Sequence, residues 1–172
     1  TGGYRQAPKP AVLARWTQFS AVCPRMIFGG KSYREPWHYA DEIESIVRRY
    51  TQFHHELLPY IKRFVDVALR DGTPIIRPLF LEFADDAEAR KHEFQFMFGD
   101  DLLVAPVYTD DLFRTVYLPQ GKWLDFHTLE IHDGAKTIEK YDAPLERLPL
   151  FVRVEGAKIF YQSLLAKQLK GF

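Results

Sequence analysis

The first part of the chain carries apolar residues at helical spacing. Within residues 11–22 they occupy positions 12, 13, 16, 19 and 21, which predicts a helix with a wide buried face. Pro24 ends that pattern because it cannot donate a backbone hydrogen bond. The apolar run at residues 25–28 then predicts a short buried strand, which Gly29 and Gly30 close.

Residues 41–72 give the clearest pattern in the sequence. Apolar side chains recur there at three- and four-residue steps, which predicts one long amphipathic helix. Asp41 followed by Glu44 fits a capping box, in which each side chain satisfies a backbone N–H at the helix start. Pro59 lies inside the pattern and predicts a kink or break. Gly72 is suited to end the helix.

The pattern changes after Gly72 to short runs that predict strands. These runs are residues 75–83, 102–107, 114–118, 122–125, 137–140 and 150–154. Turn residues separate them at positions 84–86, 99–101, 119–121 and 132–134, and a short helix is expected over residues 87–94. Short strands with regular turn signals are typical of an antiparallel β-sandwich.

A helix, one buried strand and a long helix do not make a complete fold. A strand covered on both faces by helices normally belongs to a parallel sheet, which one strand cannot form. We therefore expect residues 1–72 to be the last α-β-α part of a larger α/β barrel or doubly wound sheet. Residues 73–160 are expected to form the β-domain, and residues 161–172 a tail. The chain opens at Thr1 without a methionine, which we interpret as a cut through a longer protein.

Composition narrows the possible partners. Aromatic residues make up 15% of the chain, and 23 basic residues balance 23 acidic ones, so no net field favours nucleic acid or an anionic membrane. No run approaches the roughly 18 apolar residues of a membrane span. Cys23 is the single cysteine and is expected to be a buried structural thiol. Neither a targeting segment nor an oligomeric state can be assigned, and both a cytoplasmic and a secreted location stay open.

Metal and cofactor chemistry is not indicated. His54 and His55 are adjacent on the predicted helix and point about 100° apart, unlike the i, i+4 pair of zinc enzymes. The sequence contains no phosphate-binding glycine loop and no dinucleotide fingerprint. We expect neither a metal nor a cofactor.

A series of motifs resembles glycoside hydrolase family 31, in the family's own order. Thr-Gly-Gly-Tyr at residues 1–4 is similar to its Asp-Ile-Gly-Gly-Phe/Tyr segment, with Thr1 at the Ile position. The others are Arg-Trp-Thr-Gln-Phe (15–19), Arg-Glu-Pro-Trp (34–37), Leu-Leu-Pro-Tyr-Ile (57–61), Arg-Pro-Leu-Phe (77–80), Phe-Ala-Asp-Asp (83–86), residues 95–107, Tyr-Leu-Pro (117–119) with Trp123, and Pro-Leu-Phe-Val-Arg (149–153). Together they span residues 2 to about 154.

The resemblance implies a retaining α-glycosidase fold: a (β/α)8 barrel followed by β-domains. It places residues 1–72 at the end of the barrel, with strand 8 at residues 25–28, and residues 73–160 in the proximal β-sandwich. Retaining enzymes use two carboxylates about 5–5.5 Å apart. In this family both are Asp and precede the Asp-Ile-Gly-Gly segment, so no catalytic residue is assigned here. The chain alone is expected to be inactive.

The resemblance also implies which residues reach an α-glycoside or oligosaccharide substrate. Barrel active sites lie at the C-terminal ends of the strands, where Gly3 and Tyr4 follow strand 7. Phe28 and Gly29 end strand 8. Many members carry Arg-x-His-Gly there, with a His that bonds the sugar, whereas this chain has Ile27 at the Arg position and Gly29 at the His position. Because of this departure the resemblance does not imply ordinary α-glucosidase specificity, and both glucose and xylose stay possible.

Several alternatives stay open at these positions. The glycines allow either a close approach to a ligand or simply a tight turn. Trp37 could stack on a sugar face or pack its loop onto the barrel, and Arg34 could bond sugar hydroxyls or pair with a carboxylate. Arg15 and Trp16 are expected to be structural. The Asp-Asp pairs at 85–86 and 100–101 are read as turn residues.

A second interpretation is non-catalytic. A truncated or diverged relative would then act as a carbohydrate-binding or interaction module. Two Asp motifs encoded in a barrel context upstream of Thr1 would favour the enzyme. A genuine start codon at that point would favour the module.

Overall fold

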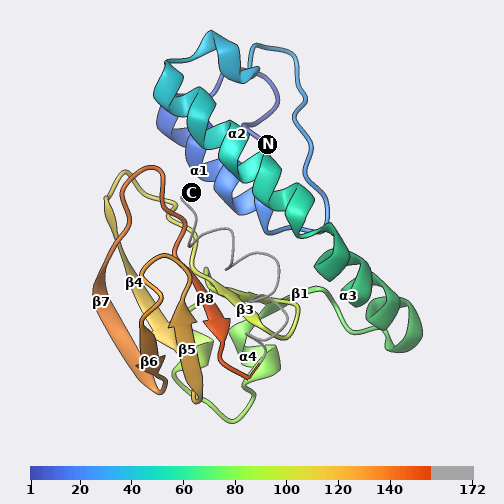
Figure 1. Cartoon of the computed structure of the whole chain (residues 1–172), viewed down its shortest axis with the longest axis vertical. Helices are drawn as coiled ribbons and strands as arrows, with labels where there is room; N and C mark the ends of the chain where they lie inside the picture. The colour runs from blue at the N-terminus through green and yellow to red at the C-terminus, as the bar shows by residue number, and fades with distance from the viewer. Residues whose placement is uncertain (156–172) are drawn as a thin grey trace.

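The computed structural model describes residues 1–155, where helices pack on a group of short antiparallel strands (Figure 1). Helix α1 spans Pro10–Ala21 and packs along α2, Asp41–Glu56. Helix α3, Leu58–Asp71, leads to the strands. The predicted tail at residues 161–172 and the end of the predicted 73–160 domain lie outside the described residues.

The helical predictions are confirmed in their main points. The predicted helix at residues 11–22 is α1. The long helix is broken at Leu57 into α2 and α3, and Pro59 stands in the first turn of α3, where no intrahelical donor is needed. Gly72 ends α3 in the left-handed conformation, with φ of 80°.

Two local predictions are wrong. Helix α2 starts at Asp41 with Ala40 as its N-cap, and no side chain caps it. The capping box therefore does not form, and Glu44 pairs instead with Arg48 along the helix. Residues 25–28 form no strand. No other strand among residues 1–155 lies alongside them, and a strand needs a paired neighbour for its backbone groups.

Within residues 1–155, eight short strands make two antiparallel sheets. The larger has the order β1-β2-β3-β8-β5-β6, and the smaller pairs β4 with β7. Their bounds are β1 Ile76–Pro78, β2 Phe96–Phe98, β3 Leu102–Val104, β4 Phe113–Leu118, β5 Lys122–Asp125, β6 Ile131–Asp133, β7 Lys136–Asp142 and β8 Leu150–Arg153.

Side chains of the larger sheet alternate between two cores. On one face, Phe98, Leu102 and Val152 pack with buried residues of α1, α2 and α3. On the other face, Met97 and Phe151 pack with buried residues of the smaller sheet. This alternation follows from the two-residue period of a strand. Because the first core contains residues from both the helices and the sheet, the helical part and the β-part share buried surface.

Several β predictions need correction. Only Ile76–Pro78 of the predicted strand 75–83 is a strand, and it continues into the short helix α4, Leu79–Glu82. Strand β2 lies outside every predicted strand. The predicted turn at 132–134 contains most of β6, which pairs with β5. The predicted helix over 87–94 shrinks to a single 3-10 turn, η2, Ala89–Lys91.

Candidate functional site

The loop before α1 and the long connection between α1 and α2 lie against each other. The backbone N–H of Lys31 donates to Tyr4 O at 2.8 Å, and the Thr1 ammonium donates to Ile27 O at 2.7 Å. Further along, the Tyr39 hydroxyl donates to Pro8 O at 3.0 Å. These bonds bring together the two segments that the sequence predicted to reach the substrate.

Arg34 lies buried between the two segments, with 3% of its surface exposed. Its Nη1 donates to Ser32 O at 2.7 Å, and its Nη2 reaches Tyr4 O and Gln6 O, each at 3.3 Å. The guanidinium therefore bonds backbone carbonyls from both segments. The predicted pairing of this guanidinium with a neighbouring carboxylate is not found: Glu35 Oε2 instead accepts the backbone N–H of Arg34.

Aromatic side chains of these segments face solvent. Tyr4, Tyr33 and Trp37 are 62%, 65% and 68% exposed. The Lys31 ammonium lies 5.9 Å from the centre of the Tyr4 ring, and the His38 ring lies 4.8 Å from that of Tyr33. Exposed rings offer an apolar face with a polar edge, which suits a sugar with one C–H-rich face. Tyr33 was not among the predicted site residues, although its place beside Arg34 was a usable signal.

The remaining predicted residues differ in exposure. Gly29 is exposed, whereas Phe28 is half-buried against the core shared by helices and sheet. Gly3 has a φ of 85°, a conformation that favours glycine. The tight turn and the close approach to a ligand are both compatible with that backbone.

One aspartate of each Asp pair in the β-part, Asp86 and Asp100, makes structural contacts. Asp86 Oδ1 accepts the backbone N–H groups of Glu88 and Ala89, and its Oδ2 accepts the Tyr117 hydroxyl at 2.6 Å. The turn interpretation is confirmed for Asp86. Asp100 instead pairs with Arg77, at 2.7 Å.

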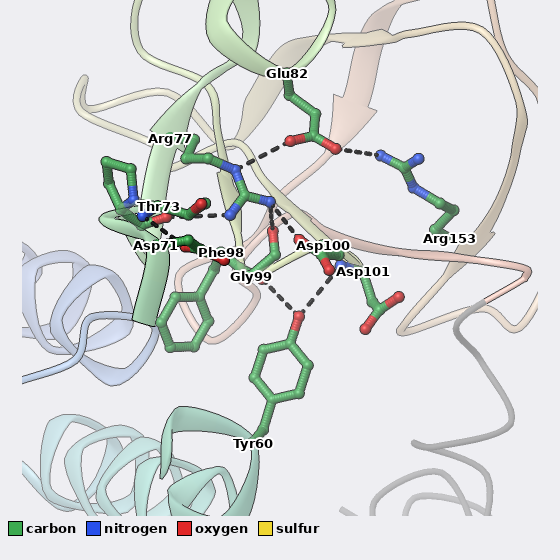
Figure 2. A network of polar contacts seen from close by, with 11 residues as sticks. Tyr60, Asp71, Thr73, Arg77, Glu82, Phe98, Gly99, Asp100, Asp101 and Arg153 are labelled. Atoms are coloured by element: carbon green, nitrogen blue, oxygen red, sulfur yellow. Dashed lines mark hydrogen bonds and ion pairs between the residues drawn. The ribbon is translucent and has the colours of Figure 1, made fainter. Parts of the chain in front are cut away.

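A polar network joins α3 to the larger sheet (Figure 2). The buried Arg77 guanidinium donates to Glu82 Oε2 at 3.0 Å and to Gly99 O at 2.9 Å, and Arg153 donates to Glu82 Oε1 at 3.3 Å. The Tyr60 hydroxyl donates to Phe98 O at 2.8 Å and accepts the backbone N–H of Asp101 at 3.2 Å. The network fixes the end of β2 against α3.

Asp101, beside this network, has a buried carboxylate that is not fully hydrogen-bonded. Its side chain is buried with Oδ2 unbonded, and burial, reinforced by Asp100, raises its pKa above the ordinary value. Because the pKa of Asp101 is higher in the folded than in the unfolded state, protonation of this carboxyl stabilises the fold. The contribution is complete at pH values below the pKa of the unfolded state. That contribution is lost as pH rises through the folded pKa.

We therefore expect Asp101→Asn to be more stable than the wild type at pH 7, by about 1 kcal/mol or less. The difference should shrink on acidification, because Asp101 itself then becomes protonated and neutral. Urea unfolding at several pH values measures it. The matched control is Asp66→Asn, the same substitution at an exposed aspartate on α3. A gain that is equal at all pH values, or a loss at pH 7, would contradict this account of Asp101.

Other candidate chemistry is limited in the described part of the chain. Residues 1–155 contain no group of three or more His, Cys, Asp or Glu side chains that could hold a metal ion. No helix in that range is long and apolar enough to cross a membrane. Cys23 is half-buried, and burial raises the pKa of its thiol to about 11, which keeps it protonated and unreactive.

Two family models match the chain. Residues 1–63 match the glycosyl hydrolases family 31 TIM-barrel domain, and residues 72–157 match the glycosyl hydrolase family 31 C-terminal domain. The first covers the two segments that Arg34 joins, and the second covers nearly all of the strands.

Similar proteins include glycosidases and a transferase. The chain is 31% identical to alpha-glucosidase 2 of Bacillus thermoamyloliquefaciens over 91% of this chain and 20% of that protein. It is 33% identical to a 1,6-alpha-glucosyltransferase of Sporosarcina globispora over 92% of this chain and 13% of that protein. A GH31 alpha-xylosidase from a soil metagenome, solved with xylose, superposes with a TM-score of 0.81 at 33% identity, over 88% of this chain and 26% of that one.

The chain thus spans about a quarter or less of the length of these relatives. The two domain models follow each other in the order that the sequence motifs predicted, and the second alone covers half of the chain. The structural likeness covers 88% of the chain at 33% identity. The chain belongs to glycosyl hydrolase family 31.

Proposed function

We propose that this chain is part of a retaining α-glycosidase that hydrolyses or transfers α-linked glycosyl residues such as glucose or xylose. The observation that carries the proposal is that both family domains follow each other along the chain, at residues 1–63 and 72–157. The named relatives act on α-glucosides and α-xylosides, in hydrolysis and in transfer. No cofactor is required for this chemistry.

The two catalytic carboxylates are proposed to come from other parts of the barrel. A retaining glycosidase needs a nucleophile and an acid/base about 5–5.5 Å apart, open to the sugar. Within residues 1–155, Asp86 bonds Tyr117 and two backbone N–H groups, and Asp100 pairs with Arg77. Neither is available as a nucleophile, and the family resemblance places both catalytic Asp residues before Thr1. We therefore expect no turnover from the 172-residue chain alone.

The finer fold assignment is part of the same proposal. Residues 1–72 are the end of the (β/α)8 barrel, and residues 73–160 are the proximal β-sandwich. A groove of about 790 Å³ between α1 and the β-part supports the barrel assignment, since its lining includes the half-exposed apolar residues Val12, Trp16 and Phe94. Apolar surface of this kind fits a contact with a neighbouring barrel helix.

The substrate-facing residues are proposed from exposure and position. Tyr4 and Trp37 offer exposed rings from the two joined segments. Gly3 and Gly29 leave the backbone open to a ligand, and Phe28 supports the segment from the core. We assign these residues to the sugar-binding face at the barrel mouth.

Trp37→Ala tests the stacking role in the full-length protein. We expect KM for an aryl α-glycoside to rise about tenfold with kcat nearly unchanged, because stacking on an exposed ring stabilises ground and transition states alike. Trp37→Phe should retain most of the binding. The control is Leu69→Ala, at a residue on α3 that is 81% exposed. An unchanged KM in Trp37→Ala would remove this residue from the site.

A substrate panel tests the function itself. The full-length protein should release p-nitrophenol from p-nitrophenyl α-glucoside or α-xyloside and leave the β-anomers intact. The isolated 172-residue chain should release none. Turnover by the isolated chain would refute the placement of the carboxylates outside it, and a full-length protein inactive on every α-glycoside would favour the carbohydrate-binding interpretation.

A further inference from the structure

We propose that Arg34 is a positioning residue, whose guanidinium locks the segment of residues 2–6 to the segment of residues 30–37 and does not itself touch the sugar. The inference rests on the proposed function, because those segments carry the proposed sugar-binding residues. It assigns Arg34, which the sequence had placed among possible substrate ligands, to a different task.

The donors of Arg34 are turned inward. Nη1 and Nη2 donate to Ser32 O, Tyr4 O and Gln6 O, and the Nε atom is buried. With 3% of the residue exposed, no N–H of the guanidinium is presented to a ligand. A bond to a sugar hydroxyl would require the Arg34 guanidinium to leave these acceptors, which would break the hydrogen bonds between the two segments.

Gly30 supplies the space that this guanidinium occupies. A Cβ built at Gly30 would lie 2.6 Å from Arg34 Nη2 and closer still to its Nη1 and Cζ. The planar end of Arg34 therefore lies directly on the backbone of residue 30. Any side chain there would push the guanidinium out, so Gly30 and Arg34 act as a pair.

The pair stands where the two segments meet. Lys31, next to Gly30, donates its N–H to the same carbonyl, Tyr4 O, that Arg34 Nη2 reaches. One acceptor thus ties the exposed Tyr4 ring to the connection that carries Tyr33 and Trp37. A charged, planar, multidentate donor holds several carbonyls at once, which lysine cannot do.

The test uses Arg34→Ala, Arg34→Lys, Gly30→Ala and the Gly30→Ala/Arg34→Ala double variant of the full-length protein. Amide hydrogen exchange without substrate is measured over residues 1–8 and 28–36. We expect exchange in both segments to rise about tenfold or more in Arg34→Ala, as for loss of charge-assisted hydrogen bonds. Gly30→Ala should raise exchange in the same two segments, and exchange in the double variant should be no faster than in either single variant. Arg25→Ala, an exposed arginine of the same connection, is the control.

Kinetics separate positioning from a general structural role. Arg34→Ala should raise KM about tenfold with kcat nearly unchanged, and Arg34→Lys should recover part of the loss. Guanidinium ion at low millimolar concentration should lower KM again in Arg34→Ala, but not in Gly30→Ala, where the Cβ fills its place. If Arg34→Ala does not fold, Gly30→Ala and Arg34→Lys carry the same comparison.

The outcomes distinguish this inference from the proposed function. Unchanged exchange of residues 1–8 in both Arg34→Ala and Gly30→Ala would overturn the positioning role, whatever the activity. A KM that rises without any change in exchange would make Arg34 a direct ligand and would also overturn it. Because exchange is read without substrate, it does not depend on the enzyme's turning over any α-glycoside.

Discussion

Trp123→Ala is expected to lower the free energy of unfolding by about 3–5 kcal/mol, the cost of emptying a fully buried aromatic site. Trp123 lies in β5 with no exposed surface, and its ring packs between the two sheets. Its Nε1 donates to Pro119 O at 2.7 Å, and the Arg153 guanidinium lies 5.4 Å from the ring centre. Alanine would lose the packing, the hydrogen bond and the cation–π contact together.

Urea unfolding of the wild type, Trp123→Ala and Trp123→Phe measures this cost. Phenylalanine keeps much of the packing and loses the hydrogen bond, so it should lose less stability than alanine. Trp16→Ala, at a tryptophan that is 43% exposed, is the matched control and should cost much less. Equal losses of unfolding free energy for Trp123→Ala and Trp16→Ala would contradict the placement of Trp123 in the buried core between the two sheets.

Arg15→Ala is expected to cost about 2–4 kcal/mol, because it leaves buried carbonyls without donors. From helix α1, Arg15 donates to Ala143 O at 2.6 Å, Arg147 O at 2.9 Å and Pro144 O at 3.1 Å. The neighbouring Gln18 donates to Leu145 O at 2.6 Å. Two side chains of one helical face thus hold the loop between β7 and β8.

Denaturant unfolding with Arg15→Lys and Arg5→Ala as comparisons tests this role. Lysine can reach one carbonyl and should recover only part of the loss, whereas the exposed Arg5 should change stability by no more than about 0.5 kcal/mol. If Arg15→Ala were as mild as Arg5→Ala, the helical part and the β-part would not be joined through this side chain.

Local sequence signals predicted the elements whose causes are local. The break at Pro59 and the stop at Gly72 each depend on one residue's backbone properties, and both are confirmed. The capping box failed because the helix starts one residue earlier than the motif requires, with Ala40 rather than Asp41 at the N-cap. A one-residue shift is enough to take the Asp41 side chain out of reach of its donor.

Elements that depend on distant partners were harder to predict. Residues of β6 read as a turn, yet Lys122 pairs with Asp133 and Trp123 with His132 across the strands. The partners of Arg34 could not be foreseen either, since Tyr4 and Gln6 lie 30 and 28 residues away. The sequence singled out Arg34 and its loop, whereas the hydrogen bonds of Arg34 depend on where the chain before α1 returns.

The anomeric form of the first product tests the central claim most directly. Time-resolved proton NMR of the full-length protein acting on an aryl α-glucoside or α-xyloside reads it before mutarotation mixes the two forms. A retaining α-glycosidase predicts that the α-anomer of the free sugar appears first, because two displacements restore the configuration. First appearance of the β-anomer would contradict the account.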